Sequence, residues 1–321
     1  MTTYGDSLGD SAKTRQRLRC QAHRCVIPVS VDAIPEEQDV PMLSTIIRTI
    51  DVRGVPIGYT DTGDPNGRSD GPVIVFGHSL LFGGWMFRAQ IDALREHYRC
   101  IAIDWRGQGG TQPTPDGYDM DTLTIDAVGL IRALRLAPVH WVGIGMGGCV
   151  GQRVAARHGE LLRSLTLLDT SADPEDPSRI GRYTRLAWAM RFLGVDAVRG
   201  KLARLLFGPA FLADPAAADT VAEWAQRLDR VDSVGTRRAI LGVIGRDPAD
   251  REVTAITAPT LVAVGGDDVV TPIRAASRLA ELIPKARFEI IENAGHCCVL
   301  EQAAVVTALI QDFLADADDR G

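Results

Sequence analysis

The sequence feature that most limits the possible folds is a set of short, almost uninterrupted apolar runs separated by segments of helix length. Strands buried on both faces have this pattern, because both sides of the strand meet apolar neighbours rather than water. The intervening segments are long enough for helices that cross from one parallel strand to the next. The sequence therefore predicts an α/β fold with a mostly parallel central sheet flanked by helices. The runs are Val73–Phe76, Cys100–Ile103, His140–Val142, Leu165–Leu168 and Leu261–Val264.

The region before these runs contains an expected strand pair and an expected tail. Ile46–Val52 and Pro56–Thr60 read as two strands turned at Arg53 and Gly54. Residues 1–41 are rich in polar residues, keep no helix or strand period and are interrupted by prolines. We expect a poorly ordered tail there, or a folded chain that begins near Met42.

A later region interrupts the alternation of strands and helices. Residues 173–250 hold amphipathic stretches such as Arg182–Phe192 and Asp219–Leu228, with no strand-like run. An insertion at this point covers the carboxyl ends of the strands, where open α/β sheets bind ligands. We therefore expect a helical cap at 173–250 over a core formed by 42–172 and 251–321.

Composition narrows the range of partners and of cellular locations. Lys and Arg total 35 against 41 Asp and Glu, so the net charge of −6 gives no reason to expect a nucleic acid or an anionic membrane. The start of the chain has no apolar segment of signal-peptide length, and no segment approaches the roughly 20 apolar residues of a membrane span. The cysteines show neither a disulfide framework nor zinc-site spacing. We expect a cytoplasmic protein with a small-molecule substrate, no metal and no cofactor; the oligomeric state is not predictable.

The residues that carry chemistry follow expected strands. Trp141–Gly148 reads W-V-G-I-G-M-G-G between a strand and a helix expected at Cys149–His158, and resembles the G-x-S-x-G nucleophile elbow with Gly145 in the serine position. Gly265–Pro272 resembles the loop that presents the catalytic acid, and its pattern points to Asp268 rather than Asp267. His296 follows Gly295 in the place of the catalytic base. An acid that precedes the histidine is the order found in α/β-hydrolases.

Each of these residues also has an ordinary structural interpretation. The glycine string could simply pack a helix on a strand, His296 could be a loop histidine, and Asp268 could begin the helix expected near Pro272. Their joint occurrence after successive strands favours the functional interpretation by about tenfold. Asp169, at another strand end, is the second candidate for the acid, although a turn into the cap is its expected role.

The chain as a whole resembles the 3-oxoadipate enol-lactone hydrolase group of the α/β-hydrolases. His78–Leu81 followed by Met86–Gln90 is similar to that group's oxyanion-loop string, and Gly145–Gln152 matches its S-M-G-G-x-x-G-Q with the serine replaced. Asp104–Gly109 matches the D-x-R-G-x-G loop of the superfamily. The resemblance covers residues 45–316 and implies an α/β-hydrolase fold with a helical cap.

The resemblance also implies a reaction on a carboxylic ester or lactone. A nucleophile at position 145 would attack the carbonyl, His296 would take its proton, and Asp268 would orient the imidazole. The backbone N–H groups of Leu80 and Met146 would form the oxyanion hole, and His78 and Ser79 would contact the substrate. Ser79 and Cys149 are weak candidates for a substitute nucleophile.

Gly145 leaves three interpretations open. The parent protein is an ester or lactone hydrolase that lost its serine, by engineering or naturally; or His296 and Asp268 serve as a general base in a cofactor-free dioxygenase or lyase; or the scaffold is a non-catalytic small-molecule receptor. Glycine is the least costly residue in the strained turn of a nucleophile elbow, so its presence is compatible with an intact fold in all three.

Overall fold

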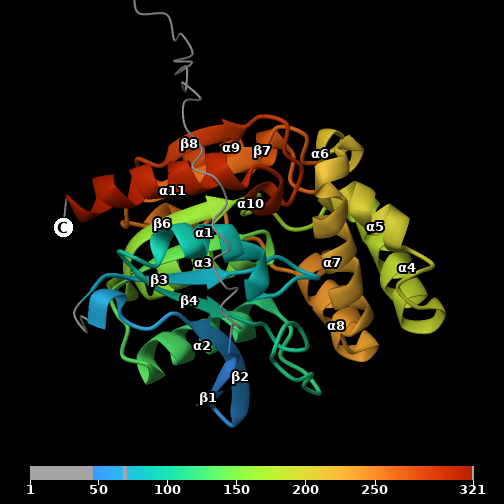
Figure 1. Cartoon of the computed structure of the whole chain (residues 1–321), viewed down its shortest axis with the longest axis horizontal. Helices are drawn as coiled ribbons and strands as arrows, with labels where there is room; N and C mark the ends of the chain where they lie inside the picture. Colours follow the sequence, from blue (N-terminus) through green and yellow to red (C-terminus); the bar gives the residue numbers. More distant parts are fainter. Residues whose placement is uncertain (1–45, 68–70, 320–321) are drawn as a thin grey trace, which may run out of the picture. The chain divides into compact units, whose positions relative to one another are not determined.

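A single mixed sheet organises the part of the chain that the computed structural model describes, residues 46–67 and 71–319 (Figure 1). Its eight strands lie in the order β1-β2-β4-β3-β5-β6-β7-β8. β1 and β2 are antiparallel to each other, β2 is antiparallel to β4, and every other neighbouring pair is parallel. The strands are β1 Arg48–Val52, β2 Val55–Asp61, β3 Val73–Gly77, β4 Arg99–Ile103, β5 Val139–Ile144, β6 Leu162–Leu168, β7 Thr260–Gly265 and β8 Arg287–Ile291.

The predicted α/β-hydrolase architecture is present, and the strands expected from apolar runs all form. Every residue of β3, β5 and β7 is buried, because helices cover both faces of the sheet. β8 lacks such a run: four of its five residues are partly or fully exposed, and it lies at the edge of the sheet. The expected tail at 1–41 falls outside the described residues.

The helices fall into two groups, one that packs on the sheet and one that lies between β6 and β7 in the chain. The first group is α1 Arg88–Leu94, α2 Met120–Ala133, α3 Met146–Arg157, α9 Ile273–Leu282, α10 Cys298–Glu301 and α11 Ala303–Asp318. The second is α4 Pro177–Leu193, α5 Arg199–Leu206, α6 Pro209–Ala213, α7 Ala218–Asp229 and α8 Ser233–Ile244. Short 3-10 helices occur at Pro65–Gly67, Gly84–Phe87, Gly159–Leu161, Pro215–Ala217 and Val253–Ala255.

Alternate strand residues supply two apolar cores, one on each face of the sheet. Val75 and Trp141 point to the face covered by α2, α3 and α9, whereas Phe76 and Val142 point to the face covered by α1 and α11. The second core continues into the segment expected to form the cap, residues 173–250, where Trp224 is fully buried beside Phe82 and Phe207. Burial of such aromatic side chains holds these helices on the sheet domain.

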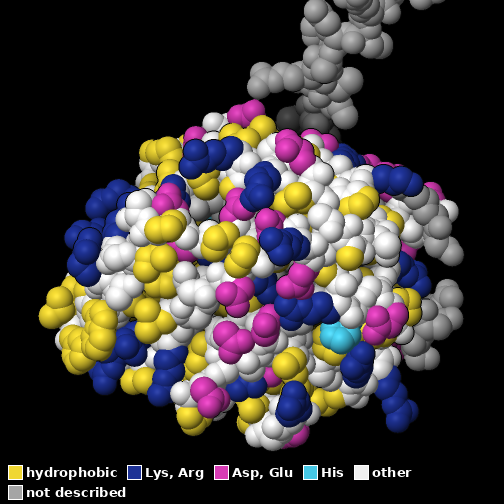
Figure 2. Space-filling view, turned by 180° about the vertical axis from the view of Figure 1, so that it is seen from behind, with side chains coloured by type: hydrophobic (Ala, Val, Ile, Leu, Met, Phe, Trp, Pro, Cys, Tyr) yellow, Lys and Arg dark blue, Asp and Glu magenta, His cyan; other side chains and the backbone are white. Residues whose placement is uncertain are grey.

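The helices α4 to α8 stand together beside the sheet, toward the ends of β3 and β6 in Figure 1. Figure 2 shows hydrophobic and basic side chains mixed over the edge of the molecule where α4 and α5 lie. Trp188 and Phe192 of α4 are among the exposed apolar side chains, and their rings stack with centroids 5.2 Å apart. Within the described residues no helix has the length and apolar composition to cross a membrane.

Candidate active site

The turn between β5 and α3 has the backbone of a nucleophile elbow. Gly145 adopts φ +52° and ψ −113°, a conformation that is costly for a residue with a Cβ atom. Its N–H donates to the carbonyl of Leu168 at 2.9 Å, and its carbonyl accepts from Cys149 N and Thr170 Oγ1, both at 3.0 Å. A Cβ atom on Gly147 would collide with the backbone of Gly77, so the glycine after the turn is required by close approach. Helix α3 begins directly at Met146, earlier than the Cys149 start expected from sequence.

Asp268 and His296 come together from the loops after β7 and β8. His296 Nδ1 lies 2.9 Å from Asp268 Oδ2. The other oxygen, Oδ1, accepts from the N–H groups of Val270 at 2.7 Å and Thr271 at 2.9 Å, which fixes the carboxylate. The contact selects the imidazole tautomer with its proton on Nδ1 and leaves Nε2 facing the cavity. The preference for Asp268 over Asp267 agrees with this geometry.

His296 is held in its charged form more strongly than a free histidine. Burial would lower its pKa, but attraction to Asp268 and the hydrogen bond that His296 donates to Asp268 outweigh burial and raise the pKa to about 9. In their ionised forms, Asp169 and Glu301 raise the pKa of His296 further. His296 is therefore neutral, and able to accept a proton, only toward alkaline pH.

The loop after β3 places Ser79 and Leu80 beside this pair, but not His78. Ser79 Oγ lies 3.3 Å from His296 Nε2, and Ser79 and Leu80 line the cavity. His78 is fully buried, with Nδ1 2.7 Å from Ser79 O and Nε2 accepting from Trp105 N at 3.1 Å. Burial lowers its pKa to about 4, so the ring is neutral. The structure therefore differs from the expectation that His78 contacts the substrate. The ring is buried outside the cavity and hydrogen-bonds to the backbone of Ser79 and Trp105.

The two expected oxyanion donors, Leu80 and Met146, both line the same cavity. Met146 is the first residue of α3, so its N–H has no acceptor within the helix. The N–H of Leu81 is already used, because it donates to Gln108 Oε1 at 2.8 Å. That leaves the N–H of Leu80 as the donor that the loop can offer to a bound carbonyl oxygen.

A second buried carboxyl group, Asp169, adjoins the Asp268–His296 pair. It follows β6 with φ +48°, and its Oδ1 accepts from Gly265 N at 2.7 Å while its Oδ2 lies 3.4 Å from Cys298 N. Burial, and then repulsion from Asp268, raise its pKa to about 8. Asp169 therefore stands beside the pair as a protonated neighbour at neutral pH, and it is Asp268 that bonds His296.

Sequence reasoning missed two further groups at the site. Glu301 accepts from the backbone N–H groups of Gly208 at 2.7 Å, Gly295 at 2.8 Å and Cys297 at 3.0 Å, which anchors the histidine loop. Arg246 Nη1 pairs with Glu175 Oε2 at 3.2 Å on the cavity wall. Neither group carries a motif, and only the position of Glu301 five residues after His296 could have drawn attention to it.

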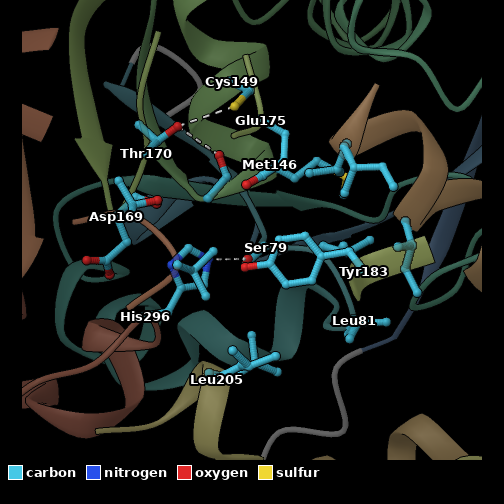
Figure 3. A pocket seen from close by; sticks show the side chains of 18 of the residues that line it. Ser79, Leu81, Met146, Cys149, Asp169, Thr170, Glu175, Tyr183, Leu205 and His296 are labelled. Atoms are coloured by element: carbon cyan, nitrogen blue, oxygen red, sulfur yellow. Dashed lines mark hydrogen bonds between the residues drawn. The ribbon is translucent and has the colours of Figure 1, made fainter. Parts of the chain in front are cut away.

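These groups surround an apolar cavity of about 110 Å³. Figure 3 shows His296 and Ser79 facing each other, with Tyr183 and Leu205 close by. The wall combines residues of the loops after β3 and β5 with residues of α4, α5 and α8, including Leu80, Met146, Tyr183, Leu205 and Ile240. A cavity of roughly 150 Å³ accepts benzene, so the enclosed space suits a small apolar group.

Comparison with known proteins agrees with this geometry. The profile described as "alpha/beta hydrolase fold" matches residues 72–303. The chain belongs to the alpha/beta hydrolase fold family. A relative from Variovorax paradoxus, named "Putative carbamate hydrolase RutD", is 32% identical over 271 residues, which span 81% of this chain and 97% of the relative.

Two lactonases are similar to this chain over most of its length. The 3-oxoadipate enol-lactonase 2 of Acinetobacter baylyi is 26% identical over 257 residues, 79% of this chain and 91% of the lactonase. The crystal structure of the enol-lactonase from Burkholderia xenovorans LB400 superposes with a TM-score of 0.76 at 26% identity, covering 83% of this chain and 99% of the lactonase. The resemblance seen in the sequence therefore extends to three-dimensional structure.

Proposed function

We propose that this alpha/beta hydrolase fold protein hydrolyses a small, uncharged carboxylic ester or lactone, with His296 as general base and Asp268 as its orienting acid. The observation that carries the proposal is the position of His296 Nε2, which faces the apolar cavity while Nδ1 is held 2.9 Å from Asp268. A base in that position can accept a proton from a hydroxyl nucleophile as it attacks a bound carbonyl. The N–H groups of Leu80 and Met146 would stabilise the developing oxyanion.

The cavity wall supports an uncharged substrate with a short apolar acyl group. Among the ionisable side chains that line the cavity, Arg246 pairs with Glu175, and His296 pairs with Asp268 behind it. Asp169 also lines the cavity, and its raised pKa of about 8 favours the uncharged form at neutral pH. A charged substrate would therefore find no unpaired side chain of opposite charge at neutral pH to offset the loss of its hydration. The names of the relatives, a carbamate hydrolase and enol-lactonases, describe substrates that share a carbonyl bonded to oxygen or nitrogen.

The absence of a side chain at Gly145 favours a second candidate, a non-hydrolytic enzyme in which His296 deprotonates the substrate itself. This candidate uses the same base and the same oxyanion donors, but it needs no nucleophile. The two candidates differ in products, because only hydrolysis yields an acid and an alcohol from an ester, or a hydroxy acid from a lactone. A receptor without catalysis would need neither His296 nor Asp268.

Hydrolysis of p-nitrophenyl acetate and γ-butyrolactone by the full chain tests the proposal. We expect measurable turnover at about pH 9, and His296→Ala should lower kcat/KM by about 10²–10⁴ because the general base is lost. His97→Ala, which removes an exposed imidazole that does not line the cavity, serves as the matched control and should keep the rate. Product analysis that shows no acid release, or equal rates for His296→Ala and the wild type, would refute the hydrolase assignment.

A further inference from the structure

The space above Gly145 is already occupied by the hydroxyl of Ser79. A Cβ atom built on Gly145 would lie 2.5 Å from Ser79 Oγ and 2.9 Å from His296 Nε2. Ser79 Oγ therefore stands where the side chain of an elbow nucleophile would project. The Ser79 hydroxyl can occupy this position only because residue 145 has no side chain; a side chain there would force Ser79 to move.

The bonding of Ser79 makes its hydroxyl a partner of the base. Among the described residues, His296 Nε2 at 3.3 Å is the hydrogen-bond partner of Ser79 Oγ. When His296 is neutral, Nδ1–H donates to Asp268, so Nε2 can only accept, and the Ser79 O–H must be the donor. This is the arrangement of hydroxyl, imidazole and carboxylate that activates a serine.

Backbone contacts hold the main chain of Ser79 in a fixed place. The carbonyl of Ser79 contacts the buried His78 ring at 2.7 Å, and its N–H lies 3.4 Å from Met86 Sδ. The carbonyl of His78 accepts from Gly147 N at 3.1 Å and from Trp105 Nε1 at 2.9 Å, which ties the loop to α3. A nucleophile must be held close to its reacting geometry, and this anchoring does so.

We propose that Ser79, rather than a residue at position 145, is the catalytic nucleophile of this chain, and that it forms a triad with His296 and Asp268. The inference rests on the proposed ester or lactone hydrolysis and names the atom that attacks. Ser79 lines the cavity, so its hydroxyl can meet a bound carbonyl. The N–H that follows it, that of Leu80, and the N–H of Met146 are the oxyanion donors.

Acyl transfer to Ser79 and hydrolysis of the resulting ester need only Ser79, His296 and water. Ser79 Oγ bonds to the carbonyl carbon as its proton moves to His296 Nε2, and the carbonyl π electrons move onto oxygen. The electron pair then returns, the bond to the alkoxy oxygen breaks, and that oxygen takes the proton from Nε2. It leaves as an alcohol from an ester, or stays on the acyl chain as a hydroxyl group when the substrate is a lactone. Water next adds to the Ser79 ester with His296 as base, which releases the acid and restores the Ser79 hydroxyl.

Labelling by a small dialkyl fluorophosphate at about pH 9 tests the inference. We expect one stoichiometric phosphoryl adduct on the full chain, located at Ser79 by tandem mass spectrometry of the tryptic peptide 69–88. Ser79→Ala should abolish the adduct and lower esterase kcat/KM at least a hundredfold. Ser277→Ala, which removes an exposed hydroxyl from α9, controls for the substitution and should be labelled like the wild type.

The double variant Ser79→Ala/Gly145→Ser shows what an absence of labelling in the wild type means. Removing the Ser79 hydroxyl clears the space that a serine at 145 needs, so this variant should be labelled on the peptide 136–153 instead. If the double variant is labelled and the wild type is not, Ser79 is not the nucleophile, although the proposed hydrolase site stands. If His296-dependent esterase activity persists in Ser79→Ala, water is the nucleophile and the inference fails. If neither protein is labelled and neither has activity, both the inference and the proposed function are wrong.

Discussion

At the scale of single residues, the site depends on what each neighbour does to His296. Asp268 orients the ring and raises its pKa, while the hydroxyl of Ser79 meets its free nitrogen. Gly145 contributes by having no side chain, because it leaves room for that hydroxyl. The hydroxyl therefore lies on the loop after β3 and not in the elbow turn, beside the proposed base His296.

The pH dependence of the reaction follows from the raised pKa of His296. The base acts only when neutral, so kcat/KM should rise with pH and level off above a midpoint near 9. Asp268→Asn removes the group that raises the pKa most, while burial, which lowers the pKa, remains. This variant should therefore show a lower midpoint as well as a much lower plateau. Rates with p-nitrophenyl acetate from about pH 6 to pH 10 check both; a midpoint that stays fixed in Asp268→Asn would contradict the assignment.

At the scale of elements, a side chain at the end of the short helix α10 links the histidine loop to the start of α6 through hydrogen bonds. Glu301 at its end accepts three backbone N–H groups, two from the histidine loop and one from Gly208, the residue before α6. Buried N–H groups without an acceptor cost about 1–3 kcal/mol each, so this one carboxylate fixes both segments. Glu301 thus positions His296 without touching the cavity.

Replacement of Glu301 should affect stability and catalysis together. Glu301→Ala leaves its three N–H partners without their acceptor, and we expect the melting temperature to fall by several degrees. Glu301→Gln keeps one oxygen and should retain more of the stability. In Glu301→Gln we expect kcat to fall by about tenfold or more with KM little changed, since a displaced imidazole harms the chemical step more than binding. A rise in KM alone, with kcat intact, would argue against this positioning role.

The sequence predicts a strand well when both faces of the strand are buried, and poorly when one face is exposed. Every residue of Val73–Phe76 and Leu261–Val264 is apolar, and these runs predict strands correctly. The sequence of β8 contains Arg287 and Glu289 and is more typical of a loop. The G-x-S-x-G, acid and histidine patterns place Gly145, Asp268 and His296. The contact of Ser79 with His296 joins residues 217 positions apart and depends on one side-chain rotamer. No local pattern encodes such a contact.

At the scale of the whole domain, the site lies where the carboxyl ends of the strands meet helices of the segment between β6 and β7. The apolar core on one face of the sheet continues into α5 and α7, so these helices share the cooperative unit of the sheet. Titratable groups buried where the sheet meets these helices therefore affect global stability as well as catalysis. Asp169 is the clearest case, since it is fully buried next to Asp268.

Asp169 should make the stability of the domain fall as pH rises. Its pKa is raised from 3.8 to about 8 in the folded state, so between these values the unfolded chain loses the proton while the folded chain keeps it. The stabilisation relative to the unfolded chain is fully present below about pH 4 and is lost as pH approaches 8. Asp169→Asn cannot ionise, yet its side-chain oxygen can still accept from Gly265 N.

The difference in melting temperature, Asp169→Asn minus wild type, should therefore grow steadily in favour of the variant from about pH 4 to pH 8 and then stay constant. Calorimetry at matched ionic strength measures it, with His296→Ala as a second background. The pKa of His296 is also raised, so its own titration lowers wild-type stability between about pH 6.5 and pH 9. The Asp169 effect should persist below pH 6.5 in both backgrounds, where His296 does not titrate in either state. Parallel curves for wild type and variant across that range would show that Asp169 ionises in the folded protein as easily as in the unfolded chain.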